Sequence, residues 1–231
     1  METRTIKLID GSLYTINLTT PELINHFNDG RNFTDIILQQ FNELSWYSKY
    51  LTDHDKIILD LGRNVGLFAI HASSWADLII AVEPTPNHME LNKQLTSDFD
   101  NITRVQAAIS DTHGEMPFYT SSGNTTMNSL IDRGEHKFMV ETLTVLDVMD
   151  KFNLDHVDFI KMDIEGSEVI ALNDNIIKQI SKRVSKILIE FHEVDGKGYS
   201  EHRKTYEDIF VKYGYKTTYF GPDGLFCTKE F

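Results

Sequence analysis

Four side chains that could bind a ligand or transfer a proton stand at the ends of short apolar runs. The runs read IIL, LIIAV, VDFIKM and KILIEF, and the polar residues that follow them are Asp60, Glu83, Asp163 and His192. Such runs are typical of strands buried on both faces of a parallel sheet. Ligands of these sheets bind at the carboxyl ends of the strands, so the four residues predict where the chemistry takes place. Polar residues often end strands without having a function. That explanation suits any one of these four residues more easily than all four together.

The loop after the first run is rich in glycine and reads Asp60-Leu61-Gly62-Arg63-Asn64-Val65-Gly66. Its glycines allow a sharp turn, and the helix that follows offers free N–H groups to an anion. The loop matches neither GxGxxG nor GxxxxGK[ST], which disfavours a dinucleotide and a P-loop. Glu83, at the end of the next strand, is placed to accept hydrogen bonds from both hydroxyls of a ribose. S-adenosylmethionine has a ribose, a carboxylate and no phosphate, and its sulfonium charge suits an acidic pocket.

The candidates for moving a proton are Asp163 and His192, with Glu165 close behind. Lys161 shares a strand face with Asp163 and could keep that carboxylate ionised. Each also has a purely structural interpretation. Asp163 could orient the turn at Glu165-Gly166, His192 could be a hydrogen-bonded strand-end histidine, Glu165 could favour a helix N-terminus, and Lys161 could form a structural ion pair.

A metal ion is a further possibility. Asp163, Glu165, His192 and Glu193 are residue types that suit magnesium or manganese. The sequence contains no HExxH motif and no spacing typical of a facial triad, so we expect no required metal.

Strands and helices alternate along most of the chain, which predicts right-handed crossovers and a mainly parallel sheet. We expect a hairpin over 6–18, strands over 57–59, 78–82, 102–108, 157–162 and 186–191, and a closing pair of strands over 215–220 and 225–229. The expected helices cover 34–51, 65–76, 87–99, 143–152, 168–180 and 199–213.

The alternation breaks between 111 and 144, where two strands flank a polar stretch. We interpret this part as a hairpin with a loop facing the active site, inserted or appended at one edge of the sheet. Asn124, Thr125, Thr126, Asn128 and Ser129 could hydrogen-bond a polyhydroxyl acceptor or belong to a solvated loop. The expected organisation is an N-terminal cap over 1–54 and one domain over 55–231 with the insertion near 112–142.

Composition narrows the function classes. The chain has 231 residues and a formal net charge of -13. That charge argues against nucleic acid or an anionic membrane as the main partner. Cys227 is the single cysteine, which excludes an intrachain disulfide and multi-cysteine zinc sites. No signal sequence or membrane span is apparent, so we expect a cytoplasmic protein.

Five segments together resemble the FkbM-type methyltransferases. They are DLGRNVGLFAI, AVEPTPNHMELNKQL, ITRVQAAISDTHGEMPFYTSSGNTTMNSL, VETLTVLDVMDKFNLDHVDFIKMDIEGSEVIAL and ILIEFH, and they cover roughly residues 55–193. The resemblance implies a class I, Rossmann-like α/β fold with a mainly parallel seven-stranded sheet, helices on both faces and an antiparallel C-terminal edge strand. It also implies S-adenosylmethionine as cofactor and the methylation of a hydroxyl on a small molecule or a saccharide unit.

The resemblance also assigns the cofactor site. By it, the methionine part would be held by Asp60, Gly62, Asn64 and Gly66, the ribose by Glu83 beside Pro84, and the adenine by Gln106, Ala107 and Ala108. Asp163 would lie between cofactor and acceptor.

Arg63 departs from the family pattern, which usually has a small residue there. We interpret it as pointing to solvent. If it filled the pocket, a non-catalytic binding protein would become the better interpretation, while a nucleotide-dependent oxidoreductase is disfavoured by the missing third glycine. The acceptor and the oligomeric state are left open by the sequence.

Overall fold

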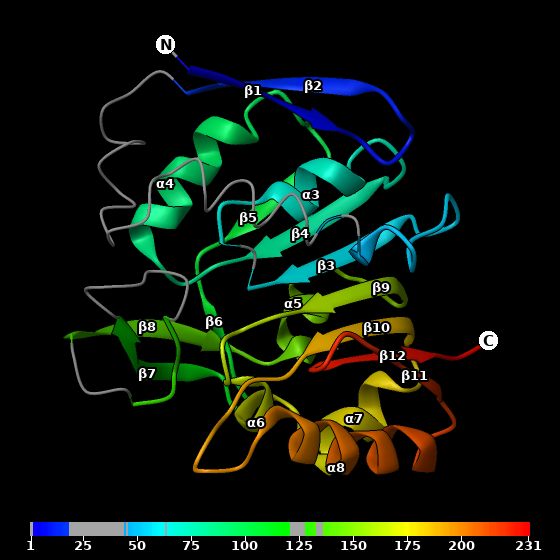
Figure 1. Cartoon of the computed structure of the whole chain (residues 1–231). Helices are drawn as coiled ribbons and strands as arrows, with labels where there is room; N and C mark the ends of the chain where they lie inside the picture. Colours follow the sequence, from blue (N-terminus) through cyan, green and yellow to red (C-terminus); the bar gives the residue numbers. More distant parts are fainter. Residues whose placement is uncertain (1, 19–43, 45, 63, 121–127, 133–135) are drawn as a thin grey trace.

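The computed structural model describes residues 2–18, 44, 46–62, 64–120, 128–132 and 136–231. Its centre is a seven-stranded sheet with the order β11-β12-β10-β9-β3-β4-β5 (Figure 1). The strands are β3 Ile57–Leu61, β4 Leu78–Val82, β5 Ile102–Val105, β9 Val157–Met162, β10 Val184–Glu190, β11 Lys216–Phe220 and β12 Gly224–Thr228. Neighbouring strands from β10 to β5 are parallel, and β12 runs antiparallel to both β10 and β11. The mainly parallel sheet and its antiparallel C-terminal edge are thereby confirmed.

The apolar runs form strands because side chains on both faces of the sheet are buried. Along β3, Leu59 and Leu61 belong to one hydrophobic core and Ile58 to the other. Helices α3 (Leu67–Ala72) and α4 (Pro86–Leu95) contribute to the core of Ile58. Helices α5 (Val145–Lys151), α7 (Asp174–Ile180) and α8 (Tyr199–Lys212) contribute to the core of Leu59. The sheet is therefore the middle layer between two layers of helices, as expected.

The inserted strands form a second sheet. β7 (Gly114–Thr120) and β8 (His136–Leu143) pair antiparallel, and β6 (Ala108–Ile109) pairs parallel with β8. The two predicted strands are confirmed, but they form a separate sheet with β6, in the order β6-β8-β7, instead of extending the large sheet. At the N-terminus, β1 (Glu2–Lys7) and β2 (Leu13–Leu18) form the expected hairpin.

The predicted helices over 65–76 and 87–99 are shorter in the structure, and two other predicted elements are each divided into two. The strand predicted over 102–108 divides at Gln106, which is exposed, and its two halves join different sheets. The helix predicted over 168–180 is interrupted at Leu172, whose backbone is extended. A new helix begins there because the Asn173 side chain accepts a hydrogen bond from the Ile176 N–H at 3.0 Å. The first piece is the short helix α6 (Glu168–Ala171).

The helix predicted over 34–51 lies largely outside the described residues, although Leu44 and Tyr47 are helical and buried. Among the helices that the structure describes, none is both long and apolar enough to cross a membrane.

Candidate functional site

A cavity opens at the carboxyl ends of β3, β4 and β9. It lies where the glycine loop, the start of α4, the β6 segment and the turn after β9 meet. The residues that line it are Gly62, Asn64, Val82, Glu83, Pro84, His88, Ala107, Ala108, Ile109, Asn128, Asp163, Ile164, Glu165 and Ser167. The site therefore occupies the edge of the sheet that the polar strand ends predict.

The glycine loop is held closely against the turn after β9. Gly62 has a φ of 78°, and a Cβ built on it would lie 1.8 Å from the carbonyl oxygen of Asp163. A Cβ on Gly66 would lie 2.6 Å from Asn92 Oδ1. Asn64 also has a left-handed backbone, with a φ of 48°, and its carbonyl accepts a hydrogen bond from Asn92 Nδ2 at 3.0 Å. Both glycines are therefore required by space as well as by conformation.

Glu83 is a buried carboxylate that organises the loop around it. Its Oε2 accepts a hydrogen bond from the Asn64 N–H at 3.1 Å, and its Oε1 accepts one from the Thr85 N–H at 3.0 Å. His88 Nδ1 lies 3.3 Å from Oε1. Burial alone would raise the pKa of Glu83, but the contacts with His88 and Thr85 outweigh burial and lower that pKa below its ordinary value. The cavity wall thus carries an ionised, rigidly held acceptor.

Lys161 joins two of the predicted acids. Its Nζ donates to Asp163 Oδ2 and to the Gly62 carbonyl, both at 3.1 Å, and lies 4.0 Å from Asp60 Oδ1. Burial would lower the pKa of Lys161, but the charges of Asp163 and Asp60 raise it above its ordinary value. The predicted pairing of Lys161 with Asp163 is present, and it also ties the glycine loop to β9.

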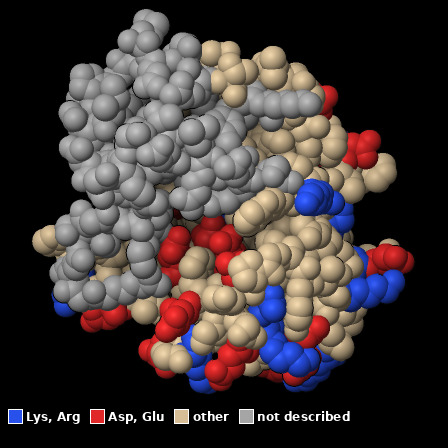
Figure 2. Space-filling model, in the orientation of Figure 1, with Lys and Arg blue, Asp and Glu red and all other residues tan. Residues whose placement is uncertain are grey.

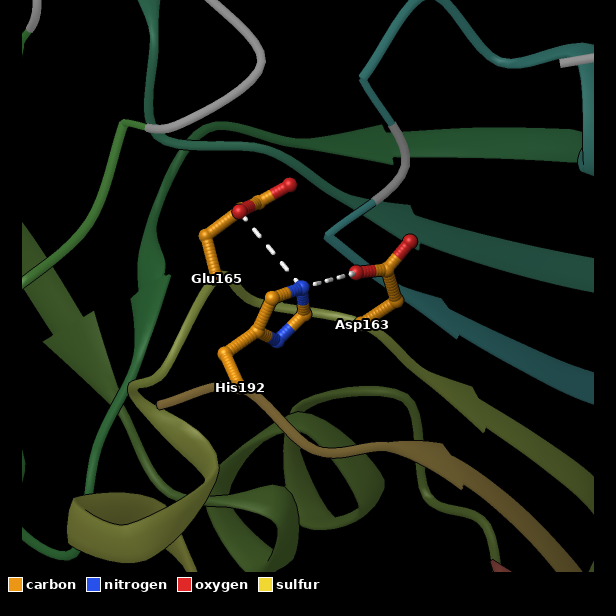
Figure 3. Close-up of side chains that lie close together, drawn as sticks. All are labelled: Asp163, Glu165 and His192. Carbon is orange, nitrogen blue, oxygen red and sulfur yellow. Dashed lines mark ion pairs between the residues drawn. The ribbon is translucent and has the colours of Figure 1, made fainter. Parts of the chain in front are cut away.

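Asp163, Glu165 and His192 converge beside the cavity (Figure 3). His192 Nε2 lies 3.8 Å from Asp163 Oδ1 and 3.5 Å from Glu165 Oε2. On the other side of the ring, Nδ1 lies 3.3 Å from Oε1 of Glu168, which is completely buried. Glu165 has a φ of 57°, a conformation that L-residues rarely adopt and that often marks functional sites.

Carboxylates outnumber cations in this region. Burial would lower the pKa of His192, but Glu168, Asp163 and Glu165 raise it to about 10. Burial and then the charge of Asp163 raise the pKa of Glu165 to about 8, and the same two causes raise that of Glu190 to about 8. Acidic side chains also gather in the hollow at the middle of the face in Figure 2. The site therefore favours a ligand that brings positive charge.

The structure brings most of the predicted cofactor residues together. Seven of them line the cavity, namely Gly62, Asn64, Glu83, Pro84, Ala107, Ala108 and Asp163, and so does Glu165, which was predicted as a candidate for proton transfer. Asp60 and Lys161 are buried next to it, Gly66 packs against Asn92, and Gln106 is exposed. The cofactor contacts of these residues stay predictions.

The residues predicted to bind the acceptor differ in where the structure places them. Asn128 lines the cavity. The prediction for Ser129 is wrong, because its side chain is completely buried and its hydroxyl is hydrogen-bonded to Ser167 Oγ at 3.1 Å and to the Ile131 N–H. Asn124, Thr125, Thr126 and Arg63 lie outside the described residues.

Several functional candidates were not apparent from the sequence. His88 lies on helix α4, whose sequence contains no motif that indicates a site. Ser167 and Glu168 follow the glycine turn, where such residues commonly begin a helix, so they gave no functional signal either. Glu190 could have been identified from the sequence, since a charged residue within the apolar run KILIEF is unusual for a buried strand. Its Oε2 accepts a hydrogen bond from the Tyr47 hydroxyl at 3.0 Å.

Comparison with known sequences identifies a related family. The profile of the family described as the methyltransferase FkbM domain matches residues 60–217, more than half of the chain. A comparison with curated proteins finds no match.

The solved structures that are similar to this chain include the following three. The methyltransferase FkbM from Methylobacillus flagellatus KT is 18% identical with a TM-score of 0.48, over 78% of this chain and 44% of that one. The fibrillarin pre-rRNA processing protein of Methanococcus jannaschii is 17% identical with a TM-score of 0.47, over 77% and 67%. Aeropyrum pernix fibrillarin with natively bound S-adenosyl-L-methionine is 14% identical with a TM-score of 0.48, over 98% and 94%. The chain thus spans less than half the length of the Methylobacillus protein.

Proposed function

The chain belongs to the FkbM methyltransferase family, and on that premise we propose that it is an S-adenosylmethionine-dependent methyltransferase. Its acceptor is a hydroxyl group of a small molecule or a saccharide unit. The observation that carries the proposal is the cavity itself, in which a glycine cradle and a buried carboxylate meet a cluster of further acids.

The residues present fit the cofactor. Gly62 and Gly66 leave no room for a side chain because Asp163 and Asn92 pack against them, so the loop keeps its tight turn beside the cavity. Glu83 is fixed by two backbone N–H groups and has further lone pairs to accept from ribose hydroxyls. Ala107 and Ala108 line the cavity, and their small side chains leave room for an adenine ring. S-adenosylmethionine supplies an electrophilic methyl group on a sulfonium, whose charge complements the surplus of carboxylates.

The chain must also align the acceptor and receive its proton. Asn128 and Glu165 line the cavity beside Asp163 and are placed to hold an acceptor hydroxyl. Alignment of this kind supplies up to ~7–11 kcal/mol of the barrier reduction in well-oriented systems. Asp163 Oδ1 and Glu165 Oε2 both lie within 3.8 Å of His192 Nε2, so we assign proton acceptance to that cluster.

The test is a calorimetric titration of the full chain with S-adenosylhomocysteine, with NAD as the control ligand. We expect roughly micromolar binding of S-adenosylhomocysteine alone, and a loss of more than about ten-fold in Glu83→Gln, since a buried acceptor for two hydroxyls is removed. Glu90→Gln is the matched control, because Glu90 is an exposed carboxylate on α4 that pairs with Lys93. Failure of the wild-type chain to bind S-adenosylhomocysteine would overturn the proposal. Binding makes a screen of hydroxylated acceptors the next step.

A further inference from the structure

Three side chains from two loops direct their donor atoms to one point (Figure 3). Asp163 and Glu165 come from the turn after β9, and His192 follows β10. One ligand atom from each lies within 4.8 Å of the other two. Two carboxylates and one imidazole are a donor set that suits a divalent cation of intermediate hardness, such as Mn²⁺.

The distances between these atoms are close to those of a coordination shell. An octahedral ion with ligands at about 2.1 Å separates adjacent ligand atoms by about 3 Å. His192 Nε2 lies 3.5 Å from Glu165 Oε2 and 3.8 Å from Asp163 Oδ1. Small side-chain rotations therefore suffice to bring the three donors around one ion, and the side chains are about one-fifth exposed, so solvent can reach the point where they meet.

An independent observation comes from Glu168, which lies behind the imidazole. Its side chain is 0% exposed, its Oε1 lies 3.3 Å from His192 Nδ1, and its Oε2 has no hydrogen-bond partner among the described residues. A buried carboxylate on one ring nitrogen fixes the imidazole with the other nitrogen directed at the ion, an arrangement found behind most metal-binding histidines.

Lys161 does not compete for the atom that would face the ion. Its ammonium group bonds to Oδ2 of Asp163 and to the Gly62 carbonyl, whereas Oδ1 is the oxygen that faces His192. The ion pair thus holds the Asp163 carboxylate in place and leaves one oxygen directed into the cluster.

We propose that Asp163, Glu165 and His192 bind a divalent cation of the Mn²⁺ type, with Glu168 positioning His192 for that contact. Asp163 and Glu165 line the same cavity as Gly62 of the glycine loop, and the ion would lie next to an acceptor hydroxyl. A cation there would hold the acceptor oxygen and lower its pKa, and in that state these three side chains would act as ligands instead of proton acceptors. This use of the ion rests on the proposed function, whereas the binding of the ion does not.

The experiment titrates the purified, metal-stripped full chain with MnCl₂ and follows free Mn²⁺ by electron paramagnetic resonance. We expect one ion per chain, bound more tightly than the roughly 10⁻⁴–10⁻³ M of the weakest protein cation sites. His192→Gln and Glu165→Gln should each weaken binding by more than about ten-fold, and Glu168→Gln by roughly 10–100-fold. MgCl₂ added as a competitor should displace Mn²⁺ poorly, because imidazole is a poor ligand for Mg²⁺.

Glu193→Gln is the matched control, since Glu193 is an exposed acid next to His192 that is not part of the cluster. Absence of Mn²⁺ binding in the wild-type chain overturns the inference, and so does equal binding in all variants, which would mean nonspecific attachment to an acidic surface. Binding of S-adenosylhomocysteine is measured on the same samples. Binding of S-adenosylhomocysteine without binding of Mn²⁺ would support the proposed function and overturn the metal site. Binding of Mn²⁺ without binding of S-adenosylhomocysteine would support the metal site and overturn the proposed function.

Discussion

A buried charged side chain in this site is stabilised by contacts with several partners. Lys161 is 4% exposed, which is costly for an ammonium group unless it is paired and hydrogen-bonded. It meets that requirement with Asp163, the Gly62 carbonyl and the nearby Asp60. One side chain therefore fixes the glycine loop and the turn after β9 relative to each other, and the same contact that stabilises the fold places Asp163 at the cavity.

Glu83 predicts a pH dependence of stability. Its pKa in the folded chain is lowered below the ordinary value of 4.5, so the ionised carboxylate contributes stability that is present above that value and is lost as the pH falls through the folded pKa. We expect Glu83→Gln to be less stable than the wild-type chain at pH 6, and this difference to shrink as the pH falls below 4.5. Urea unfolding of both proteins across this range measures it. A difference that stays constant would contradict the prediction.

Asp163 predicts a separation of turnover from folding. In Asp163→Asn the amide keeps the size of the side chain, and Lys161 still has Asp60 and the Gly62 carbonyl, so the fold should persist. Removal of a group that takes part in proton transfer typically costs roughly 10²–10⁴-fold in rate. The rate is measured with an acceptor from the screen, and circular dichroism checks the fold. Asp111→Asn, an exposed acid after β6, is the control, and equal turnover in both variants would remove Asp163 from the mechanism.

At the scale of elements, the sequence predicts the strands that leave a hydrophobic pattern. It does not predict where a strand or helix is interrupted, because local backbone geometry and distant contacts decide this. The runs 78–82 and 157–162 coincide with β4 and β9 because strands buried on both faces are apolar over their whole length. The break at Leu172 leaves no such trace, since apolar residues continue at helical spacing on both sides of it. The division of 102–108 between two sheets likewise depends on the pairing of β6 with β8, a contact distant in sequence.

The same limit applies to the site. Strand ends predict Asp60, Glu83, Asp163 and His192, because topology alone places them at one edge. Glu168 could not be predicted as a partner of His192, since their contact depends on how the turn after β9 folds back toward the end of β10. The Ile164 N–H donates to Glu168 Oε1 at 2.8 Å, so that turn is closed by the same carboxylate.

The packing of the glycine loop predicts a contrast between two substitutions. In Gly62→Ala the new Cβ would lie 1.8 Å from the Asp163 carbonyl oxygen, in addition to the strain of a φ of 78°. In Gly196→Ala the φ of 74° gives similar strain, but no heavy atom lies within 4 Å of the new Cβ. We expect a loss of about 1–2 kcal/mol for Gly196→Ala and at least about 2 kcal/mol more for Gly62→Ala. Urea unfolding measures both, and equal losses would mean that the loop moves away from the turn without cost.

At the scale of the whole molecule, the two sheets meet at the site. Ser129, between β7 and β8 of the inserted segment, shares a hydrogen bond with Ser167, and Ser167 Oγ also accepts one from the Leu130 N–H at 3.0 Å. Both serines are buried, so this contact attaches the insertion firmly to the turn that carries Asp163 and Glu165. Asn128, which is adjacent to this attachment, is thereby held at the cavity wall, and the insertion is the part of the chain in which acceptor specificity is expected to reside.

The charge of the whole molecule predicts that nucleic acid is not its acceptor. The net charge is -13, and many surface cations are already paired with acids, as Lys204 is with Asp208, Lys212 with Asp174 and Arg183 with Asp150. On the face shown in Figure 2, blue and red side chains are interspersed. Binding to nucleic acid requires unpaired Lys and Arg side chains, which neutralise phosphates and thereby displace their counterions. A chain with a net negative charge also repels the polyanion at long range.

We therefore expect labelled single-stranded RNA and duplex DNA to bind more weakly than about 10⁻⁴ M at roughly 50 mM salt, the condition that favours such contacts most. Fluorescence polarisation with the full chain measures this, and a basic nucleic-acid-binding protein provides the positive control. Micromolar binding that weakens steeply between roughly 50 and 200 mM salt would contradict the prediction, because it would reveal a local basic surface that outweighs the net charge. Weak binding at both salt concentrations would direct the acceptor screen to small hydroxylated molecules and saccharides, for which the polar Asn128 wall is suited and long-range attraction is not needed.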